Sequence, residues 1–180
     1  MDTYTQQLDP ITGKYLTLYL YTDVENTPEL RKKILAGELL CCILKTALII
    51  DPFQVVVAAN KAVLREREKK LVTKSLFTEI LYSISSSTNI SLSLTKFGIH
   101  DNDKNILVAL IHNEDDKELL AEQILCHIKG KLTPIEQLPN FNDIVLIKKI
   151  YKINEDELKV SSLSDSIVSR IGGDYPVSLK

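Results

Sequence analysis

The segment from Lys61 to Lys74 holds the densest positive charge in the sequence. It contains six basic residues and only two acidic ones, Glu66 and Glu68, which leaves a net charge of +4. Such charges on one helix can neutralise a few phosphates of a single nucleic-acid strand. The same pattern is more often a solvated helix end, stabilised by pairs such as Glu66 with Lys70. Lys148, Lys149 and Lys152 form a second, weaker basic group with the same two interpretations.

Catalytic motifs are missing from the sequence. There is no G-x-x-x-x-G-K-[ST] phosphate loop, no G-x-G-x-x-G, no G-x-S-x-G, no C-x-x-C and no H-E-x-x-H, and the chain has only 6 glycines. A kinase or a nucleotide-binding fold would need one of these glycine-rich phosphate sites. The sequence therefore predicts a protein that is not an enzyme.

The candidate metal ligands are scattered. His100, His112 and His127 fall on a loop, a strand end and a helix flank, and the acidic runs lack the glycine and terminal glutamate of a calcium loop. The cysteines are Cys41, Cys42 and Cys126; the adjacent pair has poor geometry for a disulfide. We expect all three cysteines to be small core residues, and we expect no metal and no cofactor.

Composition favours one intracellular domain. The chain has 180 residues, 44% of them hydrophobic, and a formal net charge of −2. This length suits one substantial core, so we predict a single domain over 1–180, with a core at about 8–172 and a short individual tail. The near-neutral charge gives no global field that favours nucleic acid. The N-terminus lacks a secretory signal, and the apolar runs are too short to span a membrane.

Hydrophobic periodicity predicts the elements that must position these residues. Strands are expected at Tyr15–Thr22, with one face in the core, at Leu76–Ile84, and at Ile106–His112, buried on both faces. Helices are expected at Pro28–Ala36, from Asp51 onward, after Asn89 and after Asp115. Cys41–Ile50 fits a short strand or a helix. Together these elements predict an α/β fold with a small mixed β-sheet covered by several α-helices.

Asp51-Pro-Phe-Gln54 is the clearest helix start. The Asp51 carboxylate can accept the backbone N–H of Gln54, while the Gln54 side chain reaches back to Asp51, and proline suits the first helical position. The nearly apolar segment Phe53–Leu64 follows, so this helix should run through the middle of the fold. From Arg65 the helix becomes charged and should leave the core for solvent.

Two further helices are expected near the end of the chain. Asp143 can cap the first, which carries Ile147, Ile150 and Tyr151; the second carries Val160, Leu163, Ile167 and Ile171 and ends at Gly172-Gly173. Apolar stripes of this kind are more often core than interface. A stripe at the end of a chain, however, has fewer layers left to cover it.

Three blocks of sequence resemble one family in order and spacing. They run from Ile50 to Val63, from Asn89 to Ile99 with Asn102-Asp103 after it, and from Lys148 to Lys152. They are similar to the TPRKB family, the small non-catalytic subunit of the KEOPS/EKC complex, and the resemblance extends over nearly the whole chain.

The resemblance implies a binding role. It implies a subunit that docks on the atypical kinase PRPK and stimulates it, and that reaches the threonylcarbamoyl transferase and the rest of KEOPS/EKC through this kinase. It also implies that the subunit helps hold the tRNA acceptor end while the adenosine next to the anticodon is threonylcarbamoylated. Residence in cytoplasm and nucleus follows from the same likeness. The alternative is a pure protein-protein adaptor of the kinase without its own RNA contact.

Two sets of residues are candidates for these contacts. Small interfaces depend on a few buried apolar anchors, which favours the last two helices for the kinase. RNA contact is expected on the helix that carries both the family signature and the densest positive charge. The kinase-binding candidates are Ile147, Ile150, Tyr151, Leu163 and Ile167, and the RNA-binding candidates are Asn60, Lys61, Arg65, Arg67, Lys69 and Lys70.

Overall fold

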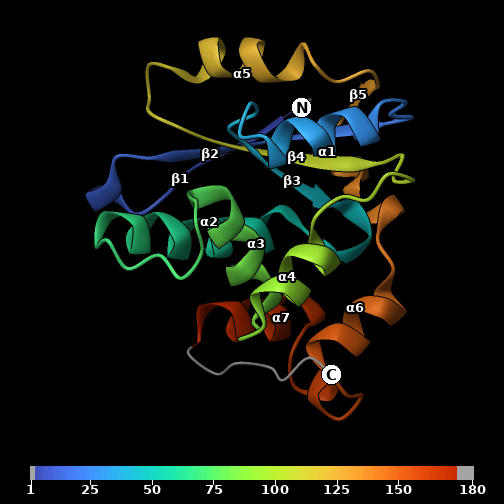
Figure 1. Cartoon of the computed structure of the whole chain (residues 1–180). Helices are drawn as coiled ribbons and strands as arrows, with labels where there is room; N and C mark the ends of the chain where they lie inside the picture. Colours follow the sequence, from blue (N-terminus) through green and yellow to red (C-terminus); the bar gives the residue numbers. More distant parts are fainter. Residues whose placement is uncertain (1–2, 174–180) are drawn as a thin grey trace.

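The computed structural model describes residues 3–173, in which strands and helices form a layered α/β fold (Figure 1). The α/β class predicted from the sequence is confirmed. Residues 174–180, which make up most of the expected tail, lie outside the described residues. The strands are β1 (Thr3–Gln7), β2 (Tyr15–Thr22), β3 (Cys42–Lys45), β4 (Ile106–His112) and β5 (Lys131–Thr133). The α-helices are α1 (Thr27–Leu35), α2 (Pro52–Arg67), α3 (Leu76–Ser85), α4 (Ile90–Phe97), α5 (Lys117–Leu125), α6 (Ile144–Tyr151) and α7 (Leu163–Gly172).

The five strands form one sheet in the order β1-β2-β4-β3, and β5 also pairs with β2. The strands β1 and β5 share one edge of β2: β1 pairs with Tyr15–Tyr19, and β5 pairs with Leu20–Thr22. Every pairing among residues 3–173 is antiparallel, so the sheet is not of the mixed kind that the sequence suggested. Alternation of strands with helices predicts a layered fold, but it does not determine the direction in which each strand returns.

Helices cover both faces of the sheet (Figure 1). On one face, Leu16, Leu18 and Leu20 of β2 belong to a core that includes residues of α2, α3, α6 and α7. On the other face, Tyr19 and Tyr21 pack in a second core with residues of α1 and α5. The expectation that β2 has only one buried face is therefore wrong. Burial raises the pKa of both tyrosines above the ordinary value of a phenol.

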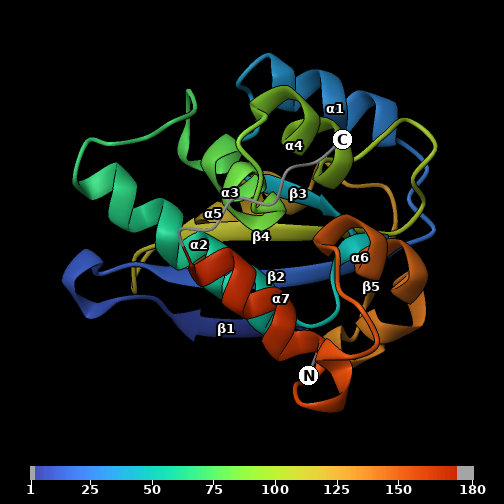
Figure 2. The same ribbon diagram turned by 90° about the horizontal axis from the view of Figure 1, so that it is seen from below.

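The central helix α2 begins as its sequence predicts. Asp51 Oδ1 accepts the backbone N–H of Gln54 at 3.2 Å. The Gln54 side chain accepts from Ile50 N, one residue before the expected Asp51, and it donates to Leu48 O and to Tyr151 Oη. Ala58, Ala59 and Ala62 are fully buried, and because their side chains are small, α2 can lie close to its neighbours. Figure 2 shows α7 lying beside α2, on the side away from the sheet.

The strand expected at Leu76–Ile84 is wrong, because this segment is the helix α3. Its apolar residues satisfy both periods: Leu76, Ile80 and Ile84 alternate as in a strand and also recur every fourth residue. The decisive local signal is Ser75, whose hydroxyl accepts from Thr78 N while Thr78 Oγ1 accepts from Ser75 N. This capping box starts a helix.

Other local expectations are confirmed. Asn89 caps α4 by accepting from Leu92 N at 3.0 Å, and Asp143 caps α6 by accepting from Leu146 N at 2.9 Å. Gly98 follows α4 with a φ of −72°, so its backbone is not left-handed. Glycine is required there by space, since an added Cβ would lie 2.6 Å from Leu94 O.

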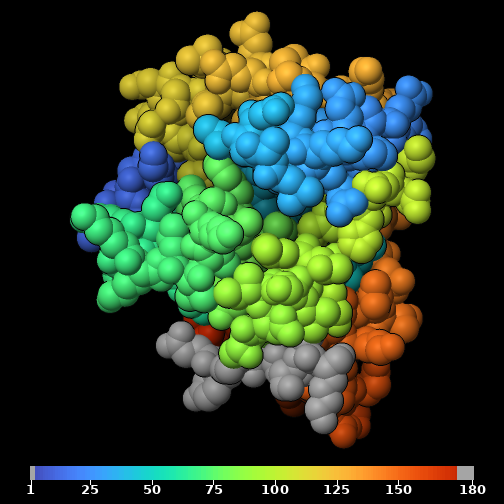
Figure 3. All heavy atoms as spheres, viewed as in Figure 1, coloured from blue at the N-terminus to red at the C-terminus, as the bar shows by residue number. Residues whose placement is uncertain are grey.

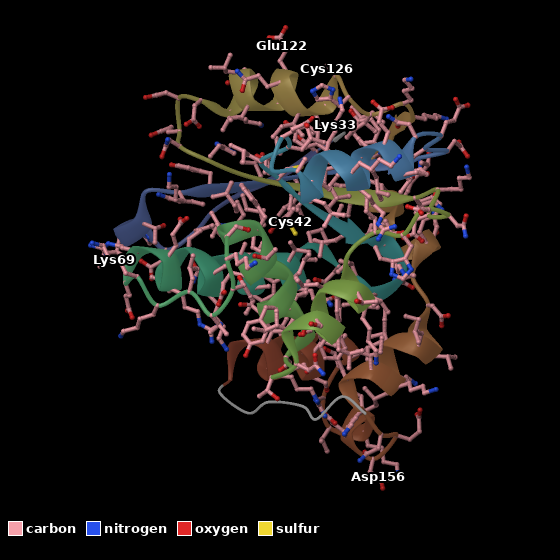
Figure 4. The ribbon with its side chains drawn as sticks, in the orientation of Figure 1. Lys33, Cys42, Lys69, Glu122, Cys126 and Asp156 are labelled. Carbon is pink, nitrogen blue, oxygen red and sulfur yellow. The ribbon has the colours of Figure 1, made fainter. Side chains whose placement is uncertain are left out.

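The cysteines divide into two kinds. Cys41 and Cys42 are buried as expected, and burial raises the pKa of Cys41 to about 12. Cys126 is exposed just after α5, so the prediction of a core position for it is wrong (Figure 4). Among residues 3–173, no helix combines the length and the hydropathy needed to cross a bilayer.

Candidate interaction surfaces

The basic end of α2 is partly engaged inside the molecule. Arg65 Nη1 lies 2.9 Å from Oε1 of Glu79, whose side chain is completely buried. The other oxygen of Glu79 accepts from the backbone N–H groups of Val72 and Thr73 and from the Thr73 hydroxyl. This buried carboxylate joins α2, α3 and the loop between them, and Arg65 neutralises its charge.

Two more RNA-binding candidates bond to the polypeptide itself. Lys61 Nζ donates to the carbonyl oxygens of Ile171 and Gly173, at 3.1 and 3.2 Å, where α7 ends. Asn60 Oδ1 accepts from the backbone N–H of Asp9 at 2.7 Å. Because a helix leaves its last carbonyls without intrahelical partners, the Lys61 ammonium group serves as a cap for α7.

Arg67, Lys69 and Lys70, the other three RNA-binding candidates, are exposed. Lys69 lies at the tip where α2 gives way to the following loop, with its side chain pointing outward (Figure 4). Lys70 Nζ is 2.9 Å from Glu68 in an exposed ion pair. The structure thus divides the six candidates into three that stabilise the fold and three that solvent can reach.

The kinase-binding candidates mostly lie in the core. Ile147, Tyr151 and Ile167 are completely buried, Ile150 is nearly so, and Leu163 packs against the same core. Tyr151 Oη donates to Ile84 O at 2.5 Å, and its ring packs edge-on against Phe97. As core residues, four of the five are unavailable to a partner in this conformation, because the apolar stripe that periodicity detects packs in the core shared with α2 and α3. Docking through α6 and α7 stays a prediction.

The first turn of α6 exposes apolar side chains that were not predicted from the sequence. Ile144, Val145 and Leu146 are 38%, 79% and 36% exposed there. Val160, expected on the last helix, precedes α7 and is 89% exposed. The available signal was the continuous apolar run after Asp143, which is too wide to be buried on one side.

A hollow of about 270 Å³ lies between α1, α3 and α4, with β3 at its floor (Figure 3). Ile34 and Leu35 of α1 form one wall, and Phe77 and Leu81 of α3 form the other. The hollow was not predicted, because its residues come from four elements that only the fold brings together.

The three histidines lie apart. His112 is buried between Thr17 and the stacked ring of Tyr15, His127 lies 2.9 Å from Lys33 Nζ, and His100 bonds to Thr95 O. Among residues 3–173, no group of three His, Cys, Asp or Glu side chains has the arrangement of a metal site.

Comparison with known proteins gives the family. The family model described as "Kinase binding protein CGI-121" matches residues 21–173, which include every element from α1 to α7. The chain belongs to the CGI-121 family. The three sequence blocks that resemble TPRKB lie within this match, in α2, around α4 and at the end of α6.

Curated relatives of this CGI-121 protein include subunits of one complex. The Danio rerio protein named EKC/KEOPS complex subunit TPRKB is 35% identical over 167 residues, which are 93% of this chain and 95% of the relative. The Aspergillus fumigatus EKC/KEOPS complex subunit cgi121 is 30% identical over 140 residues, 74% of each chain. Its Schizosaccharomyces pombe counterpart is 25% identical over 159 residues, 85% of this chain and 91% of the relative. The TPRKB resemblance is therefore confirmed.

Proposed function

We propose that this CGI-121 protein is a non-catalytic subunit of a KEOPS/EKC complex that binds the atypical kinase PRPK and stimulates it. The observation that carries the proposal is the match to a kinase-binding family over residues 21–173, together with relatives that are named KEOPS/EKC subunits. The kinase links the subunit to the threonylcarbamoyl transferase, and we place the protein in cytoplasm and nucleus.

The exposed start of α6 is the favoured kinase-docking face. This face lies on the helix that the sequence predicted for docking, but its anchors are the exposed Ile144, Val145 and Leu146 in place of the buried residues. These side chains can enter an interface without unfolding the core. Co-purification with PRPK tests this face. Val145→Asp should abolish it, whereas Leu35→Asp, an equally exposed apolar site on α1, should not. Normal recovery of the kinase with the Val145 variant would exclude this face.

The second part of the proposal is that the subunit helps hold tRNA, at its acceptor end, during threonylcarbamoylation of the adenosine next to the anticodon. Arg67, Lys69 and Lys70 are the RNA-binding candidates that remain accessible. Replacing the three by alanine should reduce the salt slope of tRNA binding by about one unit for each phosphate that is no longer neutralised. The matched control removes three exposed lysines elsewhere, Lys32, Lys129 and Lys131. Titrations with and without the terminal nucleotides of the tRNA locate the contact.

A pure kinase adaptor is the second candidate function. It is favoured by the internal bonds of Asn60, Lys61 and Arg65, which remove half of the expected RNA contacts. Unchanged affinity and salt slope in the triple variant, with PRPK binding retained, would support the adaptor. Calorimetry with Mg-ATP tests the non-catalytic part, since saturable nucleotide binding by the isolated protein would contradict it.

A further inference from the structure

Four lysines surround a hollow of about 500 Å³ beside α6. Lys45 comes from the end of β3, Lys96 from the last turn of α4, and Lys149 and Lys152 from the end of α6. The remaining lining residues are aliphatic: Leu48, Leu146 and Ile150. Figure 2 shows α6 beside the short 3-10 helix Thr46–Leu48 that follows β3, which is how these distant segments meet.

The ammonium groups of these four lysines have no ion pair or hydrogen bond to any residue within 3–173. Neighbouring lysines differ: Lys148 lies 2.9 Å from Glu155, and Lys159 lies 2.6 Å from Asp156. Among the residues that the structure describes, none that lines the hollow is acidic. Helix dipoles favour Lys96 and Lys149 in their last turns, but this effect does not account for Lys45 at the end of a strand.

Like charges gathered around one hollow repel each other, and a partner with several negative charges relieves that repulsion. Charge complementarity therefore requires an acidic occupant. The aliphatic floor requires something more, because a purely charged ligand would leave Leu48, Leu146 and Ile150 without an apolar contact.

The lining of the hollow favours a protein segment over a nucleic acid as its occupant. Bases of a single strand stack on aromatic rings or on arginine planes, and the lining residues within 3–173 include neither. Arginine forms the two-pronged contact that suits phosphate and nucleic-acid recognition, and among residues 3–173 no arginine lines the hollow. Moreover, Leu146 continues the apolar surface to Ile144 and Val145, which a protein segment can cover.

We propose that this lysine hollow binds an extended protein segment that presents an aliphatic side chain flanked by carboxylates. The aliphatic side chain enters between Leu48, Leu146 and Ile150, and the carboxylates pair with the four lysines. The inference rests on the proposed protein-docking function. The hollow adjoins the exposed start of α6, and the inference specifies the chemistry of the segment that binds there.

The test uses the full chain and a fluorescein-labelled probe peptide, acetyl-Asp-Glu-Leu-Leu-Glu-Asp-amide. One control peptide replaces both leucines with serine, another replaces the acids with their amides, and a third probe is a short single-stranded RNA. The protein variants are Lys149→Glu/Lys152→Glu and Leu146→Ser. Lys32→Glu/Lys131→Glu is the matched control with the same change in net charge.

The probe peptide should lose at least about tenfold in affinity to the Lys149/Lys152 variant and should weaken to Leu146→Ser, while the charge-matched control binds like the original protein. Both control peptides should bind weakly. Equal binding of the serine peptide, stronger binding of the RNA at the same residues, or no binding of the probe peptide would overturn the proposal. PRPK co-purification is scored separately. Failure of the peptide with retained kinase binding rejects only this inference, and the reverse result rejects only the proposed function.

Discussion

The basic end of α2 and the lysine hollow beside α6 each bring several cationic side chains together, but folding treats their charges differently. At α2, Arg65 neutralises the buried Glu79, and Lys61 caps the end of α7. At the hollow, Lys45, Lys96, Lys149 and Lys152 have no counter-ion within residues 3–173. The density of basic residues along the sequence therefore differs from the density of charge that a partner can reach. The lysines near the end of α6 are the weaker basic group in the sequence, yet the hollow beside them keeps its charges available.

This contrast predicts opposite effects of removing a charge in the two regions. Charges at the base of the α2 run should contribute to stability, because their removal leaves internal groups without partners. Charges around the hollow should contribute nothing to stability, or should reduce it slightly.

The largest effect is expected for Arg65→Ala. It leaves the Glu79 carboxylate buried without its ion-pair partner, and breaking a buried pair costs about 3 kcal/mol at the lower end of the usual range. We choose the lower end because Arg65 itself keeps some solvent contact. Urea unfolding followed by circular dichroism measures the change in the free energy of unfolding.

Arg67→Ala is the matched control on the same helix, and it should stay within about 0.5 kcal/mol of the original protein because this side chain is exposed. If the two variants were equally stable, the ion pair would not hold α2 to α3, and Arg65 would again be a candidate for RNA contact. A double variant with Glu79→Gln should recover part of the loss, since the buried group then carries no charge.

A smaller loss is expected for Lys61→Ala, which removes two hydrogen bonds to carbonyls at the end of α7. The cost should be about 1 kcal/mol, and hydrogen exchange should accelerate in the last turn of α7 before it does so elsewhere. Lys96→Ala serves as the control from the hollow. Lys96 is also partly buried but has no such bonds within residues 3–173, so the stability of this variant should be unchanged. Equal losses in both variants would contradict the distinction between the two regions.

The elements of the fold that could be predicted are those with a strong local sequence pattern. The strands β2 and β4 and the start of α2 were predicted because alternation, or a proline after a capping Asp51, determines them within a few residues. The helix α3 was mistaken for a strand because its apolar spacing satisfies both periods, and the serine cap at Ser75 was overlooked. The strands β1 and β5 were missed since they are short and largely polar, and they exist through their pairing with β2.

The candidate sites were harder to predict, because their residues are defined by tertiary partners. Glu79 lies 14 residues from Arg65, and no local pattern indicates that the two will meet in the interior. Lys45 and Lys96 belong to neither of the two basic groups of the sequence. Only the packing of α4 and α6 near the end of β3 brings them together with Lys149. The apolar periodicity of α6 and α7 correctly placed Ile147, Tyr151 and Ile167 on apolar helix stripes, but it could not show whether a stripe belongs to the core or to an interface.

The smallest effect, and the sharpest test of the comparison, is expected for Lys149→Gln/Lys152→Gln. Both substitutions keep a polar side chain of similar length and remove two of the four charges that have no counter-ion within residues 3–173. The free energy of unfolding should therefore stay within about 0.5 kcal/mol of the original and should move upward. Salt provides the independent measurement. Because salt screens repulsion between exposed charges, raising NaCl from about 20 to about 200 mM should increase the melting temperature of the original protein more than that of the variant. Lys32→Gln/Lys131→Gln loses the same net charge away from the hollow and should keep the original salt response. A double variant that is less stable than the original, or whose salt response is unchanged, would show that these lysines are compensated in the folded protein, and the contrast with the basic end of α2 would fail.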